Sequence, residues 1–370
     1  MKLRVVLGTM TFGSQTNQPD ATAQLAHFVG AGHAEIDTAR MYNKGGTETM
    51  LGAIFGERAD LRDAVRVASK ANAFDGYDKV LTAASVERQF AATSEALGGA
   101  PVDIYYLHNP DATTPILETL EAVDGLHKAG KIKELGLSNY AAWEVCHIHH
   151  LCAAHGFVKP TVYQGMYNGI TRDVERELLP CLRALGMRFY AYNPLCGGLL
   201  ACARTREDYE SLDDDSRFRK GNTMYRERYL AECQLDSVDA FRDACAEAGV
   251  PPVHAALRWL QHHSSLVDGD GIIVGASRLA HLEENLAALE SGDALPQAVV
   301  DACDAGWAKI KASGVCPSYE RGTSLYYCCH LPAPLWEGAG NDSVQTGKQD
   351  NTETISDGNI IMDLEAIVYI

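Results

Sequence analysis

A carboxylate and a phenol stand close together in the stretch from His33 to Glu48, where an apolar segment gives way to a polar turn. Asp37 ends the apolar segment, and Tyr42 follows five residues later. A free phenol has a pKa of about 10, and a neighbouring cation favours its phenolate, so the group can donate a proton near neutral pH. The pair predicts acid–base chemistry at the mouth of a sheet. Taken alone, the same two residues are more typical of a turn cap and a surface aromatic.

Two further residues could complete such a site. Lys70 ends the third apolar segment of the chain, and His108 ends the fourth. Each alone has an ordinary structural interpretation, as a solvated strand end and as a hydrogen-bonded core histidine. Because parallel strands of a barrel bring their carboxyl ends to one rim, where the active sites of such barrels lie, the four residues together favour a catalytic site.

The segments that must position these residues alternate between short β-rich stretches and longer amphipathic ones. The predicted strands are Val5–Gly8, Ala34–Thr38, Val65–Ser69, Val102–His108, Glu134–Ser138, Thr161–Tyr167, Arg188–Asn193 and Ile272–Gly275. Spacings of about 30 residues are what βαβ units require. The sequence therefore predicts a closed (β/α)8 TIM barrel over residues 1–321. Between the seventh and eighth strands it carries an insertion of about 75 residues, with an acidic, Arg-rich loop from Ala203 to Arg228 and two helical patterns.

Composition narrows the class of protein. The 370 residues are 46% hydrophobic and hold no apolar run long enough to span a membrane. A formal net charge of −17 disfavours nucleic acid and anionic membranes as partners. Eleven scattered cysteines without a CxxC pair favour reduced thiols, so we expect a cytoplasmic protein. Residues 322–370 are rich in Ser, Thr, Asn, Asp and Gly, which predicts a poorly ordered C-terminal extension.

A metal site is the main competing interpretation of the chemistry. Four histidines cluster between His147 and His155. Only His147 and His150 share a helix face, and no carboxylate or cysteine completes a zinc site beside them. We therefore expect no metal.

The chain resembles the aldo-keto reductases over about residues 4–321. The resemblance is carried by motifs that follow one another along the chain at the strand ends. They are EIDTA (35–39) with the Tyr after it, SK (69–70), YLHNPD (106–111), GLSNY (136–140), YQGMYN (163–168), YNPLCGGLL (192–200) and IIVGAS (272–277) with EEN (283–285). Within the family the chain is most similar to the aflatoxin aldehyde reductase branch, whose members also reduce succinic semialdehyde.

The resemblance implies a role for each rim residue. Tyr42 would donate a proton to the carbonyl oxygen, and Lys70 would be the cation that favours its phenolate. Asp37 would pair with Lys70, and His108 would donate a hydrogen bond to the substrate carbonyl. Arg321, in a Tyr-x-Arg segment, would bind the acidic group of the substrate.

The resemblance also implies NADPH as cofactor, held without a Rossmann domain. The nicotinamide end would be held by Asp37, Ser138, Asn139, Gln164 and Tyr192. The pyrophosphate would lie along Asn193, Pro194, Leu195, Gly197, Gly198 and Leu199, with Arg217 of the insertion as a further contact. The adenosine end would meet Gly275, Ser277, Arg278, His281, Glu284 and Asn285, near a helix N-terminus that favours a phosphate.

The expected activity is NADPH-dependent reduction of dicarbonyl or acidic aldehydes, such as succinic semialdehyde, to alcohols. An aryl-alcohol dehydrogenase or ketone reductase on the same scaffold is an alternative. A second alternative is a nucleotide-binding regulatory subunit, because related barrels associate with channels. Members of the branch are often dimers, so a homodimer is a further expectation.

Overall fold

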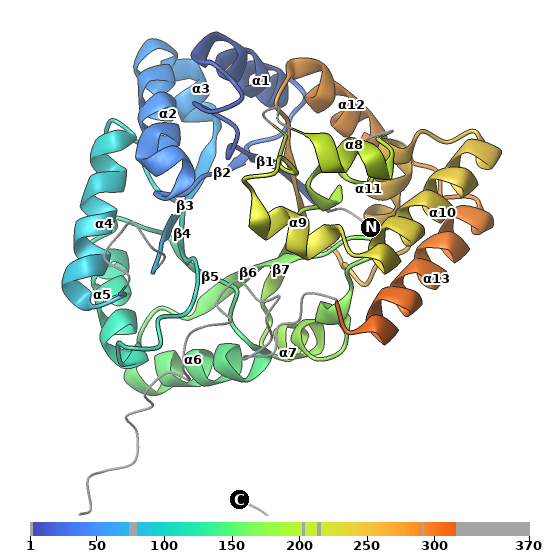
Figure 1. Ribbon diagram of the computed structural model, residues 1–370. Coiled ribbons are helices and arrows are strands. Elements are labelled where there is room, and N and C mark those ends of the chain that lie inside the picture. The colour runs from blue at the N-terminus through green and yellow to red at the C-terminus, as the bar shows by residue number, and fades with distance from the viewer. Residues whose placement is uncertain (1–2, 74–79, 202–203, 213–215, 291, 316–370) are drawn as a thin grey trace, which may run out of the picture. The chain divides into compact units, whose positions relative to one another are not determined.

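The computed structural model describes residues 3–73, 80–201, 204–212, 216–290 and 292–315. These residues carry the barrel (Figure 1). The predictions for the C-terminal extension and for Arg321 lie outside the described residues.

Eight parallel strands form a closed barrel in chain order. They are β1 (Arg4–Gly8), β2 (Glu35–Asp37), β3 (Arg66–Ala71), β4 (Ile104–Leu107), β5 (Glu134–Ser138), β6 (Pro160–Met166), β7 (Arg188–Tyr192) and β8 (Gly271–Gly275). Each predicted strand is present, and the predicted TIM barrel is confirmed. The strand bounds shift by up to two residues, with one consequence for the site: β3 runs on to Ala71, so Lys70 lies within the strand and not beyond its end.

Helices surround the barrel and bury its outer face (Figure 1). They are α1 (Gln18–Gly30), α2 (Gly46–Glu57), α3 (Ala59–Ala64), α4 (Ala83–Ala96), α5 (Ile116–Lys128), α6 (Ala142–His155), α7 (Leu178–Ala184), α8 (Arg206–Ser211), α9 (Thr223–Tyr229), α10 (Glu232–Ala248), α11 (Pro252–His262), α12 (Leu279–Glu290) and α13 (Gln297–Ser313), with 3-10 turns η1 (Tyr42–Gly45), η2 (Asp173–Glu175) and η3 (Cys196–Gly198).

The insertion between β7 and β8 is more helical than its composition suggests. The segment expected to be a loop contains α8 and α9. Helix α8 begins at a reciprocal cap: the Thr205 hydroxyl accepts a hydrogen bond from the backbone N–H of Asp208, whose carboxylate accepts one from the backbone N–H of Thr205. Such a short, polar helix has no apolar period, so periodicity could not reveal it.

The barrel interior is filled by seven buried side chains that form a core of their own: Val6, Ala68, Ile104, Tyr106, Val162, Tyr190 and Ile273. Room for the aromatic rings comes from glycine on a neighbouring strand. A Cβ atom at Gly136 would lie 2.3 Å from the Tyr106 ring, so any other residue there would displace the ring. The interior is therefore a packed core and not a channel.

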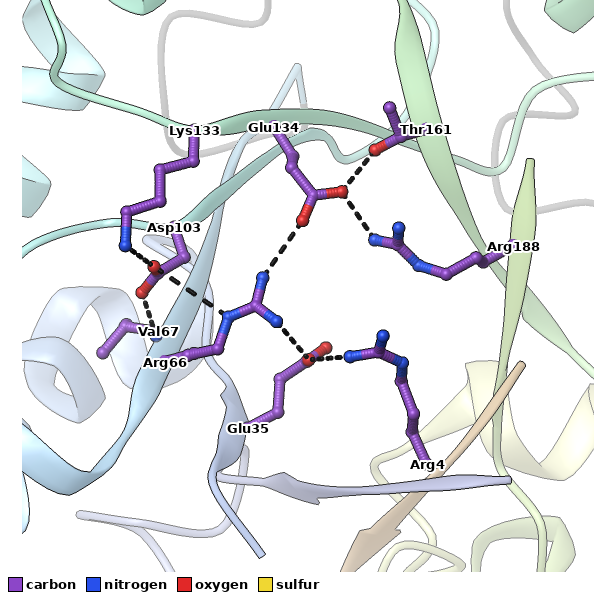
Figure 2. Close-up of polar contacts among 9 residues, drawn as sticks. All are labelled: Arg4, Glu35, Arg66, Val67, Asp103, Lys133, Glu134, Thr161 and Arg188. Carbon is purple, nitrogen blue, oxygen red and sulfur yellow. Dashed lines mark hydrogen bonds and ion pairs between the residues drawn. The ribbon is translucent and has the colours of Figure 1, made fainter. Parts of the chain in front are cut away.

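Charged side chains close the amino-terminal end of the barrel (Figure 2). The carboxylate of Glu134 accepts hydrogen bonds from Arg66 (3.0 Å), Arg188 (2.6 Å) and Thr161 (2.5 Å), which come from three other strands. Burial opposes ionisation of this carboxyl, but the bonds from Thr161 and Arg188 outweigh that cost and hold the pKa of Glu134 below its usual value. This end is an ion-paired plug, whereas the opposite end is open.

Candidate active site

The turn after β2 presents the phenol of Tyr42 at the open end of the barrel. Asp37 is the last residue of β2, and η1 begins at Tyr42. The three residues that follow Tyr42 all have left-handed backbones: φ is 48° at Asn43, 52° at Lys44 and 90° at Gly45. Left-handed residues reverse the chain sharply. The half-buried Tyr42 therefore lines the cavity and does not continue a strand.

A fully buried ammonium ion lies beneath the phenol. The Nζ atom of Lys70 donates hydrogen bonds to both oxygens of Asp37 (2.7 and 2.8 Å) and to the carbonyl of Thr38 (2.8 Å). The same Nζ lies 3.3 Å from the hydroxyl oxygen of Tyr42. Burial lowers the pKa of Lys70, and the charge of Asp37 opposes that shift. The arrangement places a compensated positive charge directly against the phenol.

The imidazole of His108 completes the group. His108 follows β4 directly, and its ring stands edge-on to the Tyr42 ring with 6.1 Å between centroids. Burial, and secondarily the charge of Lys70, hold the pKa of His108 well below its usual value. The imidazole is therefore neutral at pH 7, with one nitrogen able to donate a hydrogen bond.

This low pKa gives a testable pH dependence of stability. Unfolded His108 binds a proton near pH 6.5, whereas folded His108 stays neutral, so its contribution to stability is present above about pH 6.5 and is lost as the pH falls toward the folded pKa. We expect His108→Gln to reduce the fall in unfolding free energy between about pH 7 and pH 5 by up to about 1.4 kcal/mol per pH unit. Urea unfolding of both proteins measures it. Replacing the exposed His155 with glutamine is the control; equal slopes for wild type and His108→Gln would contradict the assignment.

A cavity of about 900 Å³ opens above these residues. Its lining includes nearly all the residues predicted for the site: Asp37, Tyr42, His108, Ser138, Asn139, Gln164, Tyr192, Asn193, Pro194, Leu195, Gly197, Gly198, Arg217, Gly275, Ser277, Arg278, His281, Glu284 and Asn285. Two differ. Lys70 lies below the cavity floor, where it contacts Tyr42. Leu199 is buried in the hydrophobic core and is not part of the lining, because the η3 turn directs it inward.

Polar residues at the cavity floor are held by one another. Gln164 donates a hydrogen bond to Asp37 (2.8 Å), and the Tyr192 hydroxyl donates one to the side-chain carbonyl of Asn139 (3.1 Å). The amide of Asn139 also donates to the backbone carbonyl of His108 (2.8 Å). These bonds fix the side chains that were predicted to surround a nicotinamide.

The insertion supplies part of the cavity lining, including residues that the sequence did not predict. Helix α9 contributes Tyr225 and Arg228, and the segment before α8 contributes Arg204. Arg217 donates a hydrogen bond to the Tyr225 hydroxyl (3.3 Å). No motif marks these positions. Their only sequence signal is a concentration of arginines in an otherwise acidic chain.

Among the described residues, no group of three or more His, Cys, Asp or Glu side chains is suited to hold a metal ion. Within the same part of the chain, no helix combines the length and the apolar character needed to cross a membrane.

The fold and the site define a class: a (β/α)8 barrel whose open end holds a Tyr–Lys–Asp cluster with a neighbouring histidine. Residues 4–308 match the model of the aldo/keto reductase family, so the chain belongs to this family of oxidoreductases, which use nicotinamide cofactors.

Relatives of known name show which branch of the family the chain resembles. The chain is 46% identical over 325 residues to the human aflatoxin B1 aldehyde reductase member 2, covering 85% of this chain and 89% of that protein. It is 44% identical over 325 residues to the human aldo-keto reductase family 7 member A3, covering 85% of this chain and 96% of the relative. A fungal oxidoreductase from Leptosphaeria maculans, sirO, is 40% identical over 287 residues, or 77% of this chain and 84% of its own. The predicted similarity to the aflatoxin aldehyde reductase branch is confirmed, and such relatives support reduction of aldehydes in general.

Proposed function

We propose that the protein is an NADPH-dependent reductase that converts dicarbonyl or acidic aldehydes, such as succinic semialdehyde, to alcohols. The observation that carries the proposal is the Tyr42 hydroxyl, which lies 3.3 Å from the buried ammonium of Lys70 and lines the large cavity. The names of the relatives add aflatoxin-derived aldehydes to the substrate class worth testing.

Reduction of a carbonyl needs a hydride on carbon and a proton on oxygen. The nicotinamide, when bound, supplies the hydride. Tyr42 gives its phenolic proton to the carbonyl oxygen, and the ammonium of Lys70 stabilises the phenolate left behind. His108 is neutral and donates a hydrogen bond to the same oxygen. Asp37 neutralises Lys70 and holds its Nζ atom in place.

The residues of the cavity fit a dinucleotide that carries several phosphates. Four arginines line it (Arg204, Arg217, Arg228 and Arg278) in a chain whose net charge is −17. Among the described residues, three carboxylates are on the lining, and one of them, Asp37, is already paired with Lys70. Concentrated positive charge in a concave site attracts polyanions. Arg278 and His281 flank the first residues of α12, where a helix N-terminus adds to this attraction and would favour the 2′-phosphate of NADPH over NADH.

The glycine turn η3 offers a test of cofactor binding. Gly197 has φ 70°, and a Cβ atom there would lie 2.6 Å from the Tyr225 ring. Gly198 has φ 104° but open space at its Cβ position. We expect Gly197→Ala to weaken NADPH binding about tenfold or more, through about 1–2 kcal/mol of backbone strain plus displacement of Tyr225. Gly198→Ala, which introduces strain alone, is the matched control in fluorescence titrations. Equal effects of both variants would count against a role for the Gly197–Tyr225 contact.

The proposal is tested by following NADPH consumption with succinic semialdehyde, 2-carboxybenzaldehyde and a simple ketone, and NADPH formation from NADP+ with an aryl alcohol. We expect the two acidic aldehydes to be reduced with the highest kcat/KM, and NADPH to outperform NADH. Preferred oxidation of the aryl alcohol or reduction of the ketone would support the dehydrogenase alternative. Tight NADPH binding without turnover of any substrate would support a regulatory subunit and overturn the proposal.

Two further expectations belong to this proposal. A cytoplasmic location agrees with the seven free cysteines of the described residues, since a reducing compartment keeps thiols reduced. A homodimer is expected by analogy with the branch. Cell fractionation and light scattering test them.

A further inference from the structure

One buried carboxylate takes no part in the proposed proton transfer. Glu48 lies in the first turn of α2 and is fully buried. One of its oxygens accepts hydrogen bonds from the hydroxyls of Ser69 (2.6 Å) and Thr93 (2.9 Å). The other accepts a bond from the guanidinium of Arg40 (3.0 Å). Burying a charged carboxylate is costly unless its partners compensate the charge. We therefore ask which parts of the structure the partners of Glu48 connect.

The partners of Glu48 sit next to the proposed proton donor and its cation. Arg40 precedes Tyr42 by two residues, and its guanidinium packs against Gly45, at the other end of the Tyr42 turn. A Cβ atom at Gly45 would lie 2.6 Å from the Nη1 atom of Arg40. Ser69 immediately precedes Lys70 on β3. One carboxylate therefore ties the turn that carries Tyr42 to the strand that carries Lys70.

Glu48 also acts on Lys70 through its charge. Burial lowers the pKa of Lys70, and the negative charges of Asp37 and, to a smaller extent, Glu48 oppose that shift. Arg40 pairs with the same carboxylate at 3.0 Å. Removing either member of the Arg40–Glu48 pair should therefore change the electric field at the Tyr42–Lys70 contact, and in opposite directions.

We propose that Glu48 is a positioning residue for aldehyde reduction, which clamps the Tyr42 turn to β3 through Arg40 and Ser69 and so keeps the phenol within reach of Lys70. The proposal rests on the proposed function, because Glu48 holds in position Tyr42 and Lys70, the two residues to which that proton transfer is assigned. None of Glu48, Arg40 and Ser69 is among the residues that line the cavity. The clamp should therefore affect the chemical step without affecting cofactor binding.

The test compares Glu48→Gln with the wild-type protein. Glutamine keeps the shape and can still bond the two hydroxyls, but it loses the charge. We expect kcat to fall about tenfold to a hundredfold, as a misplaced acid does, while the KM for the aldehyde and the Kd for NADPH change less than about threefold. Loss of a nearby negative charge favours both the neutral amine of Lys70 and the phenolate of Tyr42. The alkaline limb of the kcat profile should therefore move to lower pH, by about half a unit.

Arg40→Gln supplies the opposing variant, which also serves if Glu48→Gln does not fold. It removes a positive charge next to the same turn, so kcat should fall while the alkaline limb moves to higher pH. The double variant should lose little more kcat than either single variant, because both break one clamp. Glu144→Gln is the matched control, since Glu144 is also fully buried at the third position of its helix and accepts a backbone hydrogen bond from Ala141. Melting temperatures report any shared loss of stability.

The outcomes separate the two proposals. Opposite shifts of the alkaline limb, an unchanged NADPH Kd and non-additive losses of kcat support the clamp. A wild-type kcat in Glu48→Gln, or a loss of kcat with no shift in pH and additivity with Arg40→Gln, overturns it and leaves Glu48 a purely structural residue. If the wild-type protein reduces no aldehyde, the proposed function fails, and the clamp fails with it. Normal reduction by the wild type, with loss in Tyr42→Phe but not in Glu48→Gln, overturns the clamp alone.

Discussion

Replacing Tyr42 with phenylalanine should lower kcat for aldehyde reduction by about 10²–10⁴-fold, the range that a positioned general acid contributes. The substitution removes the one phenolic oxygen that lies 3.3 Å from the buried Lys70 ammonium, and leaves the ring in contact with His108. NADPH should still bind, because most of the cavity lining is unchanged. Stopped-flow reduction of 2-carboxybenzaldehyde, together with fluorescence titration of NADPH, measures both quantities.

The matched control for this prediction is Tyr190→Phe. Tyr190 is buried inside the barrel, with its ring near Arg188 of the ion-paired plug, and it is not among the residues that line the cavity, so the change removes a phenolic hydroxyl from outside the proposed site. We expect Tyr190→Phe to keep a kcat within about threefold of wild type. A Tyr42→Phe protein that reduced aldehydes as fast as Tyr190→Phe would remove the proton-donor role, and water or His108 would have to supply the proton.

The barrel could be predicted from the sequence because its signal is local and repeated. Each strand is a short apolar run, and each is followed by a helical period or a turn at about the spacing of a βαβ unit. The helices that were not predicted lie outside this repeated pattern of strand and helix. Helix α8 (Arg206–Ser211) buries only the side chain of Tyr209, so it has no apolar period, and its start depends on the Thr205–Asp208 cap. Helix α13 was not predicted, although Val299, Cys303 and Ile310 follow a helical spacing, because it lies beyond the eighth βα unit of the barrel.

The candidate site was predictable where residues stand at strand ends and not where packing brings them in. Asp37 is the last residue of β2 and His108 directly follows β4. The carboxyl ends of these strands must converge, so the proximity of the two residues follows from the barrel alone. Arg204 and Arg228 reach the cavity only because the insertion folds back over the strand ends. Glu48 gave no signal either, since an acidic residue in the first turn of a helix is common on protein surfaces. Glu48 is buried because α2, β3 and α4 pack together around it, and this packing cannot be inferred from the sequence near Glu48.

The largest combined effect on stability and activity is expected for Lys70→Met. The methionine fills the space of the lysine stem but leaves the carboxylate of Asp37 buried, with the amide of Gln164 as its remaining side-chain donor. Breaking a buried ion pair from one side costs about 3–5 kcal/mol. The phenolate of Tyr42 would also lose its stabilising cation, so kcat should fall by at least about 10²-fold. Urea unfolding and steady-state kinetics measure the two losses separately.

A second substitution separates the contribution of the Lys70–Asp37 ion pair to folding stability from its contribution to kcat. In the double variant Lys70→Met with Asp37→Asn, no buried charge is left uncompensated, so we expect about half or more of the lost unfolding free energy to return. The kcat should not recover, because no cation faces the Tyr42 oxygen. Recovery of both quantities together would mean that Lys70 acts only by neutralising Asp37, and that the phenol needs no cation to give up its proton. Recovery of stability alone would assign the ammonium a direct part in the proton transfer, which is the role that its 3.3 Å contact with the phenol predicts.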